Sequence, residues 1–332
     1  MTRKRRRKSS RVSLARLRRL VFVALAAALA SCAPQSGKVR GPGAARSEIP
    51  IELHGGVVMV PVKVGPSRVL RIVLDTGMGF DGVLLYAPLP ESTFPGPLIE
   101  VRIPGAGAGE PARGRMAESA SFSAGPVQFT GQRVVWLTDS LMSGFPTDGV
   151  MGYSLFGHWI VEIDYDRKIL VLHEPGAFKP DSSWTTVPMV LRKNSTPWVK
   201  FRVSISGEEP QELDGYLDLA AADEVVFLVR DDAKFKVPDG LEPLWLGRGL
   251  SGDVYGSKGR AALIELDTFR FTDVPVAFAP DSVRSKQPSA DAVICGKLLG
   301  RFNTVYDYAG GRLYLRPRQT QGRQGPTRPG LQ

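Results

Sequence analysis

The sequence predicts an all-β protein in which one folding unit is used twice. Residues 199–205 are apolar at odd positions and polar at even ones, which is the pattern of a strand with one face in a core and the other in water. Helical patterns are confined to the short segments 153–159 and 297–302. Helices this short cannot cover a parallel sheet, which excludes a βαβ architecture. Asp75 and Asp218, each after an apolar run, lie 143 positions apart and mark the repeat.

The repeat is specific because many residues keep the same offset. A single Asp-Thr-Gly tripeptide would occur by chance in about one chain in ten of this size. The matches in the same register are Asp148 with Asp291, Val150 with Val293, Leu155 with Leu298, Gly157 with Gly300, Asp164–Tyr165 with Asp307–Tyr308, and Leu170 and Leu172 with Leu313 and Leu315. A duplication of this length indicates two similar domains, each contributing one carboxylate.

The first 31 residues are typical of a signal peptide. They contain ten Lys or Arg and no acid, and the apolar run 20–30 is too short to span a bilayer comfortably. Leu29-Ala30-Ser31-Cys32 resembles the bacterial lipoprotein cleavage box, which implies that Cys32 is acylated and anchors the chain to a membrane. An ordinary cleaved signal with an incidental Cys is the alternative.

Without this leader the chain holds 33 basic and 33 acidic residues, so its overall charge gives no support for nucleic acid binding.

Residues 32–47 are small, polar and rich in Gly and Pro, and we expect them to form a flexible tether. The two lobes are expected at 48–181 and 182–317, followed by a disordered tail at 318–332. With Cys32 lipidated, Cys295 has no intramolecular disulfide partner and is expected to be a small core residue.

The chain resembles the aspartic peptidases, in their bacterial two-lobed form built from two retropepsin-like units. The first half carries the resemblance in Asp75-Thr76-Gly77, in 148–152 and in 163–165, and the second half matches more loosely at Asp218, 292–296 and 306–308. The resemblance implies two tandem retropepsin-like β-barrel lobes with an active cleft between them. It covers about residues 48–317.

By this resemblance, Asp75 and Asp218 are the candidate catalytic residues of an aspartic endopeptidase. Two carboxylates held about 3 Å apart cannot both ionise, so they share a proton and titrate as a pair. One takes a proton from a water while the other polarises the scissile carbonyl, and no covalent intermediate or cofactor is needed. The expected substrate is a peptide or unfolded protein.

Residues beside the carboxylates are expected to support the two active loops. Gly77 permits their close approach, and the family resemblance implies that the Thr76 hydroxyl reaches across to the opposing loop. In the second half Leu219 and Ala220 stand at the Thr and Gly places, which removes one hydroxyl and adds a methyl group. This departure keeps a second hypothesis open: an inactive lipoprotein that binds peptides or envelope proteins.

Glycine-rich segments are candidates for hairpins that cover the cleft. They are Gly105, Gly107 and Gly109 in the first half and Gly247, Gly249 and Gly252 in the second. They could equally be plain surface loops. Tyr255 is either a substrate-facing aromatic on such a hairpin or, more commonly for a strand residue, partly buried.

The remaining polar motifs are assigned structural roles. Asp148, Asp164, Asp291 and Asp307 are expected to hydrogen-bond in turns and to brace the active loops. Ser154 lacks the spacing of a nucleophile elbow, and the three histidines show no metal-ligand spacing, so no metal is expected. We expect a monomer, held by its lipid at the bacterial outer membrane and facing the periplasm.

Overall fold

The computed structural model describes residues 38–40, 46–94, 96–192, 195–284 and 290–319. The expected signal peptide and Cys32 lie outside them. The regular secondary structure of the described residues is almost entirely strand, and the helices in it are short: α2 (Tyr153–Phe156), α3 (Gly296–Leu299) and the 3-10 turns η1 (Glu91–Thr93) and η2 (Asp281–Arg284). None of the helices in these ranges has the length and apolar character needed to cross a bilayer.

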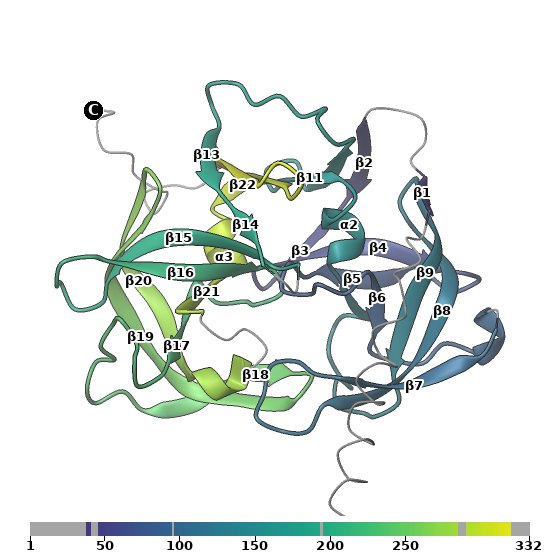
Figure 1. The fold of residues 1–332 in the computed structure, drawn as a ribbon, viewed down its shortest axis with the longest axis horizontal. Helices are drawn as coiled ribbons and strands as arrows, with labels where there is room; N and C mark the ends of the chain where they lie inside the picture. Colours follow the sequence, from purple (N-terminus) through teal and green to yellow (C-terminus); the bar gives the residue numbers. More distant parts are fainter. Residues whose placement is uncertain (1–37, 41–45, 95, 193–194, 285–289, 320–332) are drawn as a thin grey trace, which may run out of the picture. The chain divides into compact units, whose positions relative to one another are not determined.

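Six strands of the first half close into a barrel (Figure 1). They run in the order β9-β6-β10-β5-β4-β8, and β8 pairs with both β4 and β9, which closes the ring. The strands are β4 (Val57–Val64), β5 (Leu70–Leu74), β6 (Gly82–Leu85), β8 (Ala112–Ala124), β9 (Val127–Leu137) and β10 (Gly149–Met151). The strands β1 (Lys38–Arg40), β3 (Glu52–His54) and β7 (Leu98–Ile103) pair at its margins.

The second half repeats this topology. Its barrel runs β20-β17-β21-β16-β15-β19 and closes through the β15–β19 and β19–β20 pairings. The strands are β15 (Pro197–Ser204), β16 (Gln211–Asp218), β17 (Val225–Val229), β19 (Gly252–Leu266), β20 (Phe269–Pro280) and β21 (Ala292–Cys295), with β14 (Val190–Leu191) and β18 (Pro243–Gly249) at the margins. The prediction of two tandem β-barrel lobes is therefore confirmed.

A third sheet of six strands joins the two halves. Its order is β13-β23-β22-β11-β12-β2, with three strands from each half. They are β2 (Arg46–Pro50), β11 (Ile160–Asp164), β12 (Ile169–His173), β13 (Thr185–Pro188), β22 (Phe302–Asp307) and β23 (Arg312–Pro317). At the centre Val161 pairs with Tyr306 and Ile163 with Thr304, so the register is symmetric between the halves. The described residues from Lys38 onward accordingly belong to one compact unit. The expected lobe boundary, at 181/182, falls between β12 and β13.

Alternating apolar residues fill both barrels. In β4, Val58, Val60, Val62 and Val64 are buried on the inner face, as the period of two requires. Across the β8–β9 pair, the rings of Phe122 and Phe129 stack with centroids 4.5 Å apart. Each such buried side chain stabilises the fold by roughly 1.5–3 kcal/mol relative to exposure. The barrels thus give the loops at their ends a rigid support.

Three sequence expectations differ from the structure. Ser204, expected to face water, is 3% exposed because its hydroxyl accepts the Gly207 N–H in the tight turn after β15. The expected tether is partly strand: β1 pairs with β9, and β2 begins at Arg46. Backbone pairing at a strand edge does not require apolar side chains, so composition did not reveal it. The expected tail begins with an ordered residue, since Arg318 donates to Asp166 at 3.0 Å and to the Gly300 carbonyl at 3.1 Å.

Candidate active site

Asp75 and Asp218 stand where the paired inner strands of the two barrels end. Asp75 follows β5, which runs parallel to β10, and Asp218 ends β16, which runs parallel to β21. After each the backbone turns at once: the Met78 N–H donates to the Asp75 carbonyl at 3.1 Å, and the Ala221 N–H donates to the Asp218 carbonyl at 3.4 Å. The repeat therefore presents the two carboxyl groups on equivalent tight loops.

Both carboxyl groups converge on Gly77. A Cβ at this glycine would lie 3.1 Å from Asp75 Oδ1 and 3.2 Å from Asp218 Oδ2. Two oxygens that each lie this close to one point are near neighbours, and a side chain at position 77 would displace at least one of them. The structure thus brings together the two carboxylates that the sequence singled out, and it explains why glycine occupies position 77.

The Asp218 carboxylate is held by backbone amides of its own loop. Its Oδ1 accepts the Ala220 N–H at 3.0 Å and the Ala221 N–H at 3.1 Å, and the residue is 4% exposed. These bonds fix the plane of the carboxyl group and leave Oδ2 directed towards Gly77 and Asp75. Asp75 is half-buried. The pair thus combines restricted solvent access with convergence on one point of the first active loop.

Thr76 links the two loops through its side chain. Its hydroxyl donates to the Leu217 carbonyl at 2.8 Å and accepts the Leu219 N–H at 3.1 Å, and the residue is 1% exposed. Both partners belong to the second half, so one hydroxyl ties the first active loop to the strand and loop that carry Asp218. The reach of Thr76 across to the opposing loop is as expected.

The second half returns no hydroxyl from the equivalent place. Leu219 is fully buried in the main hydrophobic core, and Ala220 packs beside the smaller cluster that includes Met78. The loop accommodates the apolar side chains by burial, while its backbone N–H groups still reach Asp218 and Thr76. The side-chain link between the two active loops therefore comes from Thr76.

Two repeated aspartates brace the strands beneath the loops, as predicted. Asp148 accepts the Arg71 N–H at 2.8 Å and pairs with Arg68, while Asp291 accepts the Asp214 N–H at 2.9 Å and pairs with Arg230. Burial alone would raise the pKa of the Asp148 carboxyl, but the hydrogen bonds from Arg68 and Arg71 lower it below its ordinary value. In the turn after β11, the Asp164 carboxylate accepts the Arg167 N–H at 2.9 Å; Asp307 does the same for Gly310 after β22.

The two glycine-rich hairpin tips are hydrogen-bonded to each other. Ser251, at the tip between β18 and β19, lies among the glycines that follow β7. Its N–H donates to the Ala106 carbonyl at 2.9 Å, its carbonyl accepts the Gly109 N–H at 2.7 Å, and its hydroxyl accepts the Gly105 N–H at 3.2 Å. A Cβ at Gly107 would lie 2.4 Å from the Ser251 carbonyl. These segments are thus hairpin tips that join the two halves.

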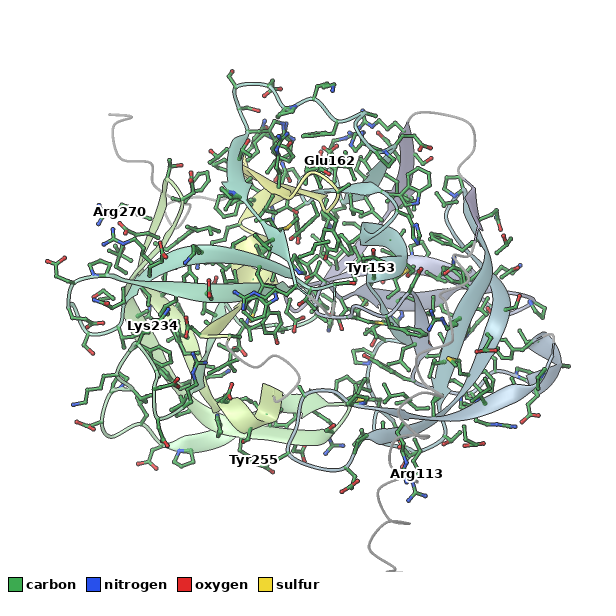
Figure 2. The ribbon with its side chains drawn as sticks, viewed as in Figure 1. Arg113, Tyr153, Glu162, Lys234, Tyr255 and Arg270 are labelled. Carbon is green, nitrogen blue, oxygen red and sulfur yellow. The ribbon has the colours of Figure 1, made fainter. Side chains whose placement is uncertain are left out.

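The second tip has its own glycines. Gly249 faces Ala106, since a Cβ there would lie 2.4 Å from the Ala106 carbonyl. Gly247 and Gly252 have no atom within 4 Å of such a Cβ and have φ of +154° and +99°. Tyr255 lies near β18 at the lower edge of Figure 2, and it is 58% exposed. The expectation of a partly buried tyrosine is wrong, because its cross-strand neighbour Trp245 is itself 53% exposed and offers no cover.

Tyr86 is a site residue that the sequence did not reveal. It follows β6, its ring lies 6.4 Å from that of Phe145, and it borders the apolar cluster that includes Met78 and Ala220. Burial raises the pKa of Tyr86, and the charges of Asp75 and Asp218 raise it further. The phenol therefore lies within electrostatic reach of both carboxylates. The one sequence signal for Tyr86 is its spacing of two residues from Leu84, which puts the two side chains on the same face of the strand end.

Other residues considered from the sequence have structural contacts. Ser154 is fully buried, and its hydroxyl donates to the Gly82 carbonyl at 3.0 Å. His173 Nε2 lies 2.7 Å from Glu162 Oε2 inside the joining sheet. The Cys295 thiol is buried. Within the described ranges, no three His, Cys, Asp or Glu residues gather in a way that could hold a metal ion.

The chain is similar in structure to an aspartic proteinase. The crystal structure of aspartic proteinase from Irpex lacteus matches with a TM-score of 0.55 and 14% sequence identity, covering 85% of this chain and all of that one. The fold is that of the pepsin-like aspartic proteinases. No protein-family model and no curated protein sequence matches the chain. This similarity shows the fold of the chain. At 14% identity it does not show the activity, which depends on the residues of the site.

Proposed function

We propose that this chain is an aspartic endopeptidase in which Asp75 and Asp218 activate a water molecule. The convergence of the two carboxylates on Gly77 is the observation that supports it most strongly. In this proposal the two carboxyl groups share one proton, so that one is a base and the other an acid at the same pH. This pairing supplies both functions that hydrolysis of a peptide bond needs.

Each part of the site has a place in this mechanism. The ionised carboxylate takes a proton from the water as the water attacks the scissile carbonyl carbon, while the protonated carboxyl donates a hydrogen bond to the carbonyl oxygen. The tetrahedral intermediate then collapses, the C–N bond breaks, and the leaving nitrogen takes the proton that the first carboxylate accepted from the water. The amides of Ala220 and Ala221 keep the Asp218 carboxylate oriented throughout. The hairpin tips around Ser251 would have to part to admit a polypeptide.

The test is cleavage of an unfolded, fluorescently labelled protein by the purified full chain from acidic to neutral pH. Asp75→Asn and Asp218→Asn should each abolish cleavage, a loss of at least about a thousand-fold for removal of one acid–base partner. Asp239→Asn makes the same chemical change at an exposed residue and should leave cleavage intact. Absence of cleavage by the wild-type chain, or cleavage that persists in both dyad variants, would refute the proposal.

An inactive peptide-binding protein is the second candidate, supported by Leu219 and Ala220 in the second active loop and by the hydrogen-bonded hairpin tips. On this hypothesis the fold holds an extended peptide or an envelope protein without cleaving it. Saturable capture of the unfolded substrate, equal in the wild-type chain and both dyad variants and without cleavage, would favour it.

We also propose that the chain is lipid-anchored at Cys32 to the bacterial outer membrane, faces the periplasm and acts as a monomer. The support is the segment Leu29-Ala30-Ser31-Cys32 after an apolar run. Labelling of cells with a clickable fatty acid should mark the wild-type chain and fail to mark Cys32→Ser. Membrane fractionation with sizing of the detergent-extracted protein would test the location and the monomer.

A further inference from the structure

One ring of the first half has no counterpart in the second. Tyr153 begins α2, and its ring lies over Gly157, where a Cβ would be 2.6 Å from the ring atoms. The ring centroid is 6.5 Å from that of Tyr308. Tyr153, labelled in Figure 2, thus fills the space between the short helix and this second tyrosine.

The equivalent position in the second half is Gly296. The equivalence is structural as well as sequential: the Tyr153 N–H donates to the Met78 carbonyl at 3.1 Å, and the Gly296 N–H donates to the Ala221 carbonyl at 2.9 Å. Gly300 then corresponds to Gly157, and Tyr165 corresponds to Tyr308. Among the described residues, no ring begins this helix as Tyr153 begins α2, although the Tyr165 ring lies beside it, 3.5 Å from a Cβ on Gly300.

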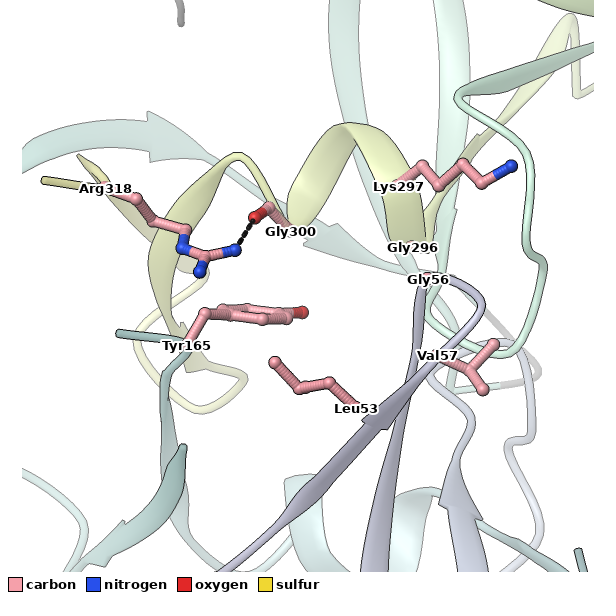
Figure 3. A pocket seen from close by; sticks show the side chains of 8 residues that line it. All are labelled: Leu53, Gly56, Val57, Tyr165, Gly296, Lys297, Gly300 and Arg318. Atoms are coloured by element: carbon pink, nitrogen blue, oxygen red, sulfur yellow. Dashed lines mark hydrogen bonds between the residues drawn. The ribbon is translucent and has the colours of Figure 1, made fainter. Parts of the chain in front are cut away.

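A pocket of about 220 Å³ lies at this place (Figure 3). Its lining comes from both halves: Leu53, Gly56, Val57, Tyr165, Gly296, Lys297, Gly300 and Arg318. A cavity of about 150 Å³ suffices to bind benzene. The volume is therefore large enough for an aromatic ring of the size that Tyr153 supplies in the first half.

The hydroxyl of Tyr165 gives the pocket a polar group without a partner. Tyr165 is 3% exposed, and its hydroxyl makes no hydrogen bond within the part of the chain that the structure describes. Figure 3 shows the hydroxyl end of the ring directed towards Gly296 and Gly56. Burial raises the pKa of Tyr165, so the phenol stays protonated and can donate as well as accept. A buried hydroxyl left unbonded costs about 1–3 kcal/mol, which a bound hydroxyl group would recover.

Among the described residues, Tyr165 is the only tyrosine that lines this space. A Cβ on Gly296 would lie 2.4 Å from the Gly56 carbonyl oxygen, so a side chain cannot grow from the helix as Tyr153 does. Outside the described ranges the sequence contains one aromatic residue, Phe22, which has no polar group. A second ring with a hydroxyl would therefore have to come from another molecule.

We propose that this pocket binds a small neutral phenol, with the ring over Gly296 and Gly300 and the ligand hydroxyl bonded to Tyr165. The Leu53 side chain, on the other side of the Tyr165 ring from Arg318 in Figure 3, supplies apolar contact. The ligand has about eight heavy atoms, so a dissociation constant on the order of 1 mM is expected. The pocket is a site separate from the carboxylate pair.

Binding can be measured with p-cresol, the side-chain analogue of tyrosine, by saturation-transfer NMR on the full chain. Toluene lacks the hydroxyl and 4-methylcyclohexanol lacks the planar ring, so the three probes separate the two features of the ligand. Tyr165→Phe should weaken p-cresol binding about five-fold, the loss of one hydrogen bond. Tyr255→Phe removes the same hydroxyl at an exposed site and should not change it. Leu53→Phe should block the pocket, with its fold checked by circular dichroism.

Saturable p-cresol binding that is weakened in Tyr165→Phe, unchanged in Tyr255→Phe and stronger than that of both other probes would support the site. Three results would overturn it: no saturable binding to the wild-type chain, equal binding by toluene or by 4-methylcyclohexanol, or binding indifferent to Tyr165→Phe. If Leu53→Phe does not fold, the comparison of Tyr165→Phe with Tyr255→Phe still shows whether p-cresol binds at Tyr165.

Discussion

Leu219 stands in the second half where Thr76 stands in the first, and its N–H donates a hydrogen bond to the Thr76 hydroxyl at 3.1 Å. The two residues show how the duplicated site has become unequal. One supplies a side-chain group that bridges the halves, and the other supplies a backbone donor and buried apolar surface.

The Thr76 hydroxyl should therefore matter for stability. Thr76→Val keeps the shape but leaves the Leu217 carbonyl and the Leu219 N–H buried without this partner, which should cost about 2–4 kcal/mol. Thr76→Ser keeps the hydroxyl and should cost only about 1 kcal/mol for the lost methyl group. Urea denaturation of both variants measures the difference. Equal losses in the two would show that the cross-brace has little energetic weight.

The hairpin tips should open when Gly107 is replaced. Gly107→Ala places a Cβ against the Ser251 carbonyl in a backbone with φ of +119°, so the contacts between the tips should break. Gly252→Ala is the matched control, since its φ is +99° and it has open space around it. We expect amide exchange at Gly109 and Ser251 to quicken at least about ten-fold in Gly107→Ala and much less in Gly252→Ala. Unchanged exchange in Gly107→Ala would mean that the tips are not held by these bonds.

Acid should remove the contribution of Asp148 to stability. Its pKa is lowered in the folded chain, so its stabilising effect is fully present above the unfolded pKa of about 4 and is lost as the pH falls through the lower folded value. Asp148→Asn should reduce the free energy of unfolding by about 1–2 kcal/mol at pH 7. The difference from the wild-type chain should shrink below about pH 4. Urea denaturation at several pH values tests this, and a constant difference down to pH 2 would contradict it.

The ionisation of Tyr86 should report the charge of the carboxylate pair. Burial raises its pKa, and Asp75 and Asp218 raise it further, because a negative charge disfavours the tyrosinate. Asp75→Asn or Asp218→Asn should therefore lower the pKa of Tyr86. Ultraviolet titration of each variant, with and without Tyr86→Phe, isolates this phenol. Identical titration of Tyr86 in all backgrounds would place it outside the site.

The all-β character and the repeated carboxylates could be predicted from the sequence because both follow from local patterns that occur twice, whereas the closed barrels were implied by the family resemblance. Asp75 and Asp218 occupy the same position of the repeat, each after an apolar strand. Because the two halves have the same topology, these equivalent positions lie on equivalent loops. Other features depend on contacts between distant segments. Ser251 meets Gly105 only after both barrels have closed, Tyr86 reaches the site by the direction in which β6 ends, and Arg318 is ordered by Asp166 and Gly300. Neither spacing nor composition encodes such pairings.

The symmetric pairing of β11 with β22 has a consequence for how the molecule could diverge. Each half supplies all strands of its own barrel and three strands of the joining sheet, so the architecture is one that two identical chains could also form. Identical subunits would carry every substitution twice. With both halves in a single polypeptide, threonine can be kept on one side and leucine on the other, and a ring can fill one helix end while the other stays open to an outside molecule.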